Sequence, residues 1–153
     1  MLLQRLNKND LPEIIAFNRR CFSPGDRWSG EDWTELLEDE RAHYYALLEN
    51  GQIVGNMFLY DWQGERDFLK IMNLGVAPDR RGQGLACRLL QKAAEELKAS
   101  MLTRCCGETR ESNLAMRRVL ERCGYRLNKT EENYYENPTE SACKYVLRRE
   151  ELE

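Results

Sequence analysis

The sequence predicts an α+β or α/β domain in which helices cover the faces of a mixed β-sheet. Apolar residues repeat with strand spacing in some segments and with helical spacing in others. Asn50-Gly51 lies between two strand-like runs and predicts a hairpin. A basic glycine turn, Arg81-Gly82-Gln83-Gly84, separates an apolar strand from an amphipathic helix. Together these patterns predict the order β-α-α-β-β-β-α-β-α-β-β.

The first half of the chain supplies two helices and four strands. Residues 1–6 form a strand candidate. Asp10-x-x-Glu13 is an acidic box ahead of apolar residues at helical spacing, which predicts a helix to about Arg20. Ser29-x-x-Asp32 caps a second helix, after the break at Ser23-Pro24-Gly25. Three strands follow, at residues 43–49, 52–61 and 68–76.

The second half adds two helices and three strands. A helix begins near Gly84, and its predicted buried face is Leu85, Leu89, Leu90, Ala93, Ala94 and Leu97. A short buried strand is predicted at 101–106. Ser112-Asn113 opens the last helix, and Gly124 is placed as its C-cap. Strands at 125–135 and 142–148 complete the chain.

Length and composition restrict the class of protein. The 153 residues predict one domain, residues 1–153, and net charge −3 argues against partnership with nucleic acid or an anionic membrane. The beginning of the chain shows no secretory pattern, which predicts a cytoplasmic location. Six cysteines without CxxC pairing and a single His43 predict free thiols and no metal site.

The glycine turn has the features of an anion site. The first N–H groups of a helix lack partners inside the helix and can point at one phosphate. Gly82 and Gly84 let the main chain approach a ligand closely, and Arg81 adds positive charge. The first hypothesis is therefore a ligand that carries a pyrophosphate. The turn alone also fits an ordinary loop.

Longer motifs around this turn resemble the GNAT superfamily of acyl-CoA-dependent N-acetyltransferases. The run from Leu74-Gly75-Val76 through Arg81-Gly82-x-Gly84-Leu85-Ala86 is similar to the acetyl-CoA signature Q/R-x-x-G-x-G/A. The run from Glu108 through Ser112-Asn113 to Gly124-Tyr125 is similar to the second motif. The resemblance implies an α+β GNAT fold, with a mixed, mostly antiparallel seven-stranded sheet and helices on both faces.

The same resemblance implies a cofactor site without metal. It places the pyrophosphate of acetyl-CoA on the backbone of the turn and the pantetheine arm beside a strand edge. The backbone N–H of Val76 is then the candidate oxyanion donor. Asn113 corresponds to a cofactor contact, although it also suits a helix N-cap. The cofactor residues so implied are Leu74, Gly75, Val76, Arg81, Gly82, Gln83, Gly84, Leu85, Ala86, Cys87 and Asn113.

Shorter motifs are most similar to the RimI-type, or ribosomal-protein, N-alpha-acetyltransferases. They are Trp28-Ser29, Glu108 ahead of Ser112-Asn113, and Asn133-Tyr134-Tyr135. The resemblance implies that Glu108 is the general base for the amine. The alternative for Glu108 is a surface position or an ion pair with Arg104 or Arg110.

One position departs from the family pattern. The family commonly places a tyrosine, as general acid, on the helix of the second motif, and this sequence has Leu120 there. Tyr134 or Tyr135 could supply the missing hydroxyl. Water could protonate the thiolate instead, because thiols with a pKa of about 8.5 are good leaving groups. A chain that binds acyl-CoA but catalyses poorly is the third possibility.

The first functional interpretation is an acetyl-CoA-dependent N-acetyltransferase acting on the α-amine of a peptide or protein. The first alternative is a small-amine acetyltransferase for polyamines, aminoglycosides or amino acids. It predicts an acidic acceptor groove, for which the candidates are Glu31, Asp32, Glu131, Glu132 and Glu136. The second alternative is a non-catalytic acyl-CoA-binding module. The expected partners are acetyl-CoA and the amine, with the protein a monomer or a homodimer.

Overall fold

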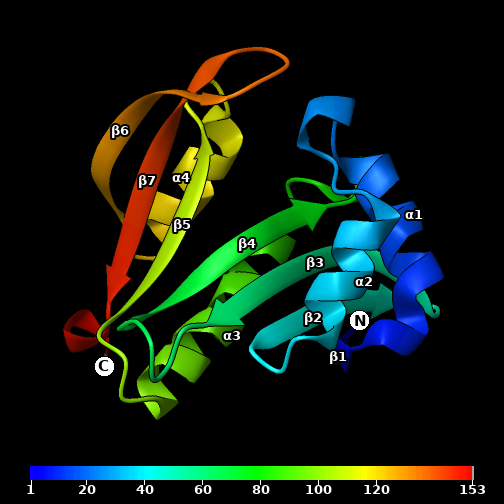
Figure 1. Cartoon of the computed structure of the whole chain (residues 1–153), viewed down its shortest axis with the longest axis horizontal. Coiled ribbons are helices and arrows are strands. Elements are labelled where there is room, and N and C mark those ends of the chain that lie inside the picture. Colours follow the sequence, from blue (N-terminus) through cyan, green and yellow to red (C-terminus); the bar gives the residue numbers. More distant parts are fainter. Residues whose placement is uncertain (153) are drawn as a thin grey trace.

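A computed structural model describes residues 1–152. Four α-helices and seven strands follow the predicted order, and short 3₁₀ turns lie between some of them (Figure 1). The prediction of a single domain over 1–153 stays a prediction, and residue 153 lies outside the described residues. The elements are β1 (Leu2–Leu6), α1 (Leu11–Cys21), α2 (Gly30–Glu38), β2 (Ala42–Glu49), β3 (Gln52–Asp61), β4 (Phe68–Val76), α3 (Leu85–Ala99), β5 (Arg104–Arg110), α4 (Leu114–Arg122), β6 (Arg126–Tyr135) and β7 (Glu140–Arg148).

All seven strands belong to one sheet, in the order β1-β2-β3-β4-β5-β7-β6. Every neighbouring pair is antiparallel except β4 and β5. This confirms the predicted mixed, mostly antiparallel sheet. The two parallel strands pair only from Phe68–Arg104 to Lys70–Cys106 and then diverge (Figure 1). The divergence leaves one edge of β4 without a strand partner beyond Lys70.

A bulge bends β4 at the point of divergence. Phe58 of β3 pairs with Asn73, but the next residue, Leu59, pairs with Ile71. Met72 is therefore the extra residue on β4. A bulge of this kind increases the local twist and turns the strand away from its neighbour. The wedge between β4 and β5 follows from this bend.

Helices cover both faces of the sheet, as predicted, and each face has its own core. On one face α1 and α2 pack against β2 and β3, around Ile14, Phe17, Trp33 and Phe58. On the other face α3 and α4 pack through leucines such as Leu89, which is fully buried. Truncating a buried leucine of this kind to alanine costs about 2–5 kcal/mol. The two cores therefore stabilise the sheet on either side of the wedge.

The predicted strand at 101–106 is wrong in its bounds. Ser100 accepts the N–H of Leu102 and donates to the Leu97 carbonyl, so residues 100–102 close the end of α3. Met101 points outward and is 84% exposed. The strand instead runs from Arg104 to Arg110, because β7 pairs with it over that whole length. Glu108 consequently lies within β5 rather than after it.

Candidate active site

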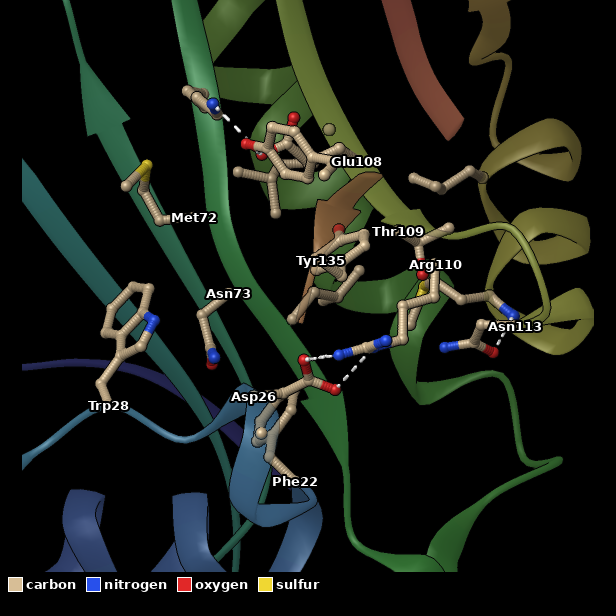
Figure 2. Close-up of a pocket in the computed structure, with 18 of the residues that line it drawn as sticks. Phe22, Asp26, Trp28, Met72, Asn73, Glu108, Thr109, Arg110, Asn113 and Tyr135 are labelled. Carbon is tan, nitrogen blue, oxygen red and sulfur yellow. Dashed lines mark hydrogen bonds and ion pairs between the residues drawn. The ribbon is translucent and has the colours of Figure 1, made fainter. Parts of the chain in front are cut away.

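Two adjoining pockets lie in the wedge between β4 and β5. The first, called the turn pocket, has a volume of about 380 Å³ and is lined by residues of the glycine turn and the start of α3. The second, called the strand pocket, has a volume of about 450 Å³ and lies between β4, β5, β6 and the α1–α2 connection (Figure 2). The two pockets share five lining residues, Phe22, Asp26, Leu74, Asn113 and Met116.

The turn pocket brings together ten of the eleven cofactor residues predicted from the sequence. Gln83 is the exception and is exposed. Gly82 and Gly84 have φ of +79° and +78°, and a Cβ on either would meet no atom within 4 Å. Residues that carry a side chain rarely adopt this backbone conformation, which explains why glycine occupies both positions. The space above them is open to a ligand.

The start of α3 provides the donors of this pocket. The Arg88 N–H makes the first turn's bond, to the Gly84 carbonyl. The N–H groups of Leu85, Ala86 and Cys87 precede it, so the helix itself offers them no acceptor. No acidic residue occupies this first turn. These features suit a phosphate, so the residues present fit the pyrophosphate of acetyl-CoA.

The free edge of β4 faces the junction of the two pockets. The Ala77 N–H donates to the Val54 carbonyl in β3. Because backbone groups of successive strand residues point to opposite sides, the N–H and C=O of Val76 face away from β3. The Val76 carbonyl accepts the Arg81 Nε at 3.2 Å, which agrees with that direction. The sequence-predicted oxyanion donor thus lies on the unpaired edge.

Glu108 projects into the strand pocket and is 17% exposed. Its carboxylate accepts the Tyr134 hydroxyl at 2.5 Å. Lys70 Nζ lies 3.4 Å from one carboxylate oxygen and Lys144 Nζ lies 3.8 Å from the other. The predicted alternative partners, Arg104 and Arg110, are not the ones observed. Lys70 was not predicted as a partner of Glu108, although a charged residue inside an apolar strand run was a signal.

Two tyrosines, Tyr134 and Tyr135, line the strand pocket together with Leu120. Burial, the hydrogen bond to Glu108 and the charge of that carboxylate raise the pKa of Tyr134 above its usual range. Burial, followed by the charge of Glu108, raises the pKa of Tyr135. Only Tyr134 bonds to Glu108, while the ring of Tyr135 lies 4.7 Å from the Arg110 guanidinium. Leu120 itself is 2% exposed and contributes only apolar surface.

Arg110 joins the two loops that border the strand pocket. It forms an ion pair with Asp26 at 3.0 Å, as Figure 2 shows, and a second with Glu140 at 3.3 Å. It also donates to the carbonyls of Glu136 and Pro138. These bonds connect the end of β5 with the α1–α2 connection and the β6–β7 turn. The hydrogen bonds and charge of Asp26 raise the pKa of Arg110 further.

A glycine marks the closest contact between these loops. A Cβ on Gly25 would lie 2.5 Å from the Asn137 carbonyl oxygen. The backbone of the α1–α2 connection therefore packs directly against the β6–β7 turn. No pattern in the sequence indicates this contact, because the two segments lie more than a hundred residues apart.

Asn113 has the capping role that was weighed for it. Its Oδ1 accepts the Met116 N–H at 3.2 Å at the start of α4. Asn113 also lines both pockets. Since Oδ1 is used by the cap, the amide nitrogen is the atom that could serve a ligand.

Within residues 1–152, no group of His, Cys, Asp and Glu could hold a metal, and no helix is long and apolar enough to cross a membrane.

The fold and the site define a class of protein. An open helix N-terminus, an unpaired β4 edge and a carboxylate at the far end of one wedge are typical of an acyl-CoA-dependent acyltransferase. The chain belongs to the acetyltransferase (GNAT) family, whose model matches residues 11–125. It is therefore an acetyl-CoA-dependent N-acetyltransferase, as the sequence predicted.

Similar proteins refine the place of the chain within the family. A putative [ribosomal protein bS18]-alanine N-acetyltransferase of Bacillus subtilis (strain 168) is 30% identical, over 92% of this chain and 90% of that protein. The ribosomal-protein-S18-alanine N-acetyltransferase from Escherichia coli superposes with a TM-score of 0.86 at 25% identity, covering 99% and 98% of the two chains. These matches confirm the predicted RimI-type resemblance.

A more distant structure shows the fold alone. Arabidopsis thaliana NAA60 in complex with acetyl-CoA has a TM-score of 0.81 at 14% identity, with 96% of this chain and 97% of that chain covered.

Proposed function

We propose that the protein acetylates the α-amine of peptide or protein N-termini, with the strand pocket as the acceptor site. The observation that carries the proposal is Glu108, a mostly buried carboxylate that faces this pocket opposite the free edge of β4. The two relatives that match over nearly the whole chain are named as ribosomal protein S18-alanine N-acetyltransferases, the Bacillus subtilis protein putatively. Their extent of similarity supports the same class of acceptor here.

The turn pocket is the proposed donor site. Backbone N–H groups from Arg81 to Cys87 would hold the pyrophosphate of acetyl-CoA, and the β4 edge from Leu74 to Val76 would pair with its pantetheine arm. Bound there, acetyl-CoA supplies the activated acetyl group. The Val76 N–H is the proposed stabiliser of the oxyanion, since it points to that edge. Asn113 would contribute its amide nitrogen.

Glu108 is the proposed general base. An α-amine titrates at about pH 8 and a lysine amine above about pH 10, so more of an α-amine is neutral at neutral pH. Glu108 would accept the proton that the amine nitrogen carries once it has attacked the thioester. Tyr134 is the proposed replacement for the hydroxyl missing at Leu120, because it bonds to Glu108 and lies in the same pocket. Its raised pKa keeps it protonated at neutral pH, which an acid requires.

The small-amine alternative predicts an acidic acceptor groove, and the strand pocket does not provide it. Among the described residues that line the strand pocket, none is one of the five predicted acidic residues. The carboxylates that do line it, Asp26 and Glu108, are both paired with cationic side chains. Glu131 is itself paired with Lys144 at 3.2 Å. A polycation would therefore find little free negative charge.

A peptide screen tests the proposal. CoA release is measured with short peptides whose N-termini are free or blocked, and with spermidine in parallel. Turnover of the free peptides alone is the expected result. Equal turnover of free and blocked peptides, or turnover of spermidine alone, would contradict it.

The protein is proposed to act in the cytoplasm as a monomer or homodimer. Its proposed partners are acetyl-CoA and the amine acceptor, without a metal, a nucleic acid or a membrane.

A further inference from the structure

The carboxylate of Glu108 in the strand pocket lies close to two positively charged side chains. Lys70 on β4 lies 3.4 Å from Glu108, lines the same pocket and is 29% exposed. Lys144 on β7 approaches the other carboxylate oxygen at 3.8 Å and is shared with Glu131. A protonated amine that approaches Glu108 must therefore come close to the ammonium group of Lys70.

The remaining titratable groups around Glu108 do not reverse this balance. Its neighbours on the packed elements are Cys106 on β5, Tyr134, Tyr135 and Glu131 on β6, and Lys144 on β7. Among the charged side chains that line the pocket, three are cationic and two are carboxylates. One of those carboxylates, Asp26, is bound by Arg110. Both carboxylates that line the pocket are thus already paired with cations, and Lys70 is the lining ammonium group beside Glu108.

We propose that Lys70 is a specificity-determining residue that excludes protonated amines and admits the neutral amine. The inference rests on the proposed function and names its substrate class more narrowly. At pH 7.5 the neutral fraction of a peptide α-amine exceeds that of a lysine or polyamine amine about 250-fold, given pKa values of about 7.8 and 10.4. A pocket that accepts only neutral amines therefore selects α-amines from more basic competitors.

Equilibrium binding to the wild-type chain gives the first test. Calorimetry compares two analogues of one acceptor peptide, with a permanently charged trimethylammonium or a neutral methyl group in place of the amine. The neutral analogue should bind about tenfold more tightly, since like charges a few ångströms apart in a partly buried site repel. Tighter binding of the cationic analogue, or equal binding of the two, overturns the inference.

Variants at Lys70 assign the effect to its charge. Lys70→Met should remove the preference for the neutral analogue, and Lys70→Arg should keep it. Lys129→Met is the matched control, because Lys129 is a strand lysine that pairs with another carboxylate, Glu131, at 3.8 Å and does not line the pocket. A preference that survives in Lys70→Met overturns the inference. The wild-type comparison stands by itself if a variant fails to fold.

A pH series supplies a readout that a merely structural role would not change. Affinity of the wild-type chain for a free peptide should rise as pH passes through the α-amine pKa of about 8, and this rise should flatten in Lys70→Met. An identical slope in both proteins argues against the role of Lys70. Peptide turnover measured alongside separates the outcomes: turnover without any analogue preference removes only this inference, whereas no turnover and no binding removes the proposed function as well.

Discussion

The turn pocket and the strand pocket differ in what they present to a ligand. Just over half of the residues that line the turn pocket come from one continuous segment, 74–87, and the phosphate donors proposed there are backbone N–H groups. The strand pocket takes side chains from β4, β5, β6, α4 and the α1–α2 connection. Binding in the turn pocket should therefore be most sensitive to substitutions that change the backbone conformation. Activity in the strand pocket should be most sensitive to substitutions that remove a side-chain functional group.

The largest effect is expected when the Glu108 carboxylate is removed from the strand pocket. Glu108→Gln keeps the size of the side chain and removes the base, so kcat should fall about 10²–10³-fold. Acetyl-CoA affinity should stay within about twofold, because Glu108 does not line the turn pocket. Steady-state kinetics and calorimetry measure the two quantities. Unchanged turnover would support the non-catalytic alternative instead.

The turn pocket should respond to backbone strain. Gly84→Ala places a side chain at φ +78°, where the local strain is about 1 kcal/mol, and relaxing that strain rotates the first N–H groups of α3. Acetyl-CoA should then bind about tenfold more weakly, with kcat at saturation nearly unchanged. Calorimetry gives the affinity.

Gly64→Ala is the matched control for this strain. Gly64 also has positive φ, +90°, and open space around its Cβ position, but it lies in the β3–β4 turn, away from both pockets. It should lose similar stability in a thermal melt and keep its affinity for acetyl-CoA. Equal loss of affinity in both variants would mean that the turn acts only through stability.

The same contrast explains what the sequence could predict. Turn chemistry and helix starts depend on neighbouring residues, so the element order followed from local patterns. Ten of the eleven residues that the family resemblance implied for the cofactor line one pocket. Glu108 was found because a motif carries it. Its partners Lys70 and Lys144 come from separate strands, and their proximity depends on the register of β4, β5 and β7.

The border of the strand pocket was not predictable for a similar reason. Arg110 and Asp26 are 84 residues apart in the chain, and the sequence gives no periodic signal for a contact between loops. The residues after α3 show the opposite failure: an apolar run suggested that a strand began at Met101, but a turn occupies residues 100–102 and β5 begins at Arg104. Pairing with β7, which the local pattern does not reveal, sets the bounds of that strand.

The loop contact should affect the acceptor more than the donor. Gly25→Ala places a Cβ 2.5 Å from the Asn137 carbonyl, so the two loops must separate. KM for an acceptor peptide should rise about fivefold, and acetyl-CoA affinity should stay unchanged. Gly30→Ala is the control, because its Cβ would meet only the flexible end of Ile15 at 3.3 Å. A fall in acetyl-CoA affinity with an unchanged peptide KM would reverse the assignment of the two pockets.

The smallest expected effect separates two neighbouring tyrosines. Tyr134→Phe removes the hydroxyl that donates to Glu108, so kcat should fall about threefold if that hydroxyl supplies the proton. Tyr135→Phe keeps the ring beside Arg110 and should change kcat less than twofold. The pKa of Tyr134 is raised above the ordinary tyrosine value of about 10, so its hydroxyl stays protonated up to at least that pH. Wild-type kcat should therefore show no fall from tyrosine ionisation between pH 8 and about 10. Equal rates for Tyr134→Phe and the wild-type protein would leave water as the source of the proton.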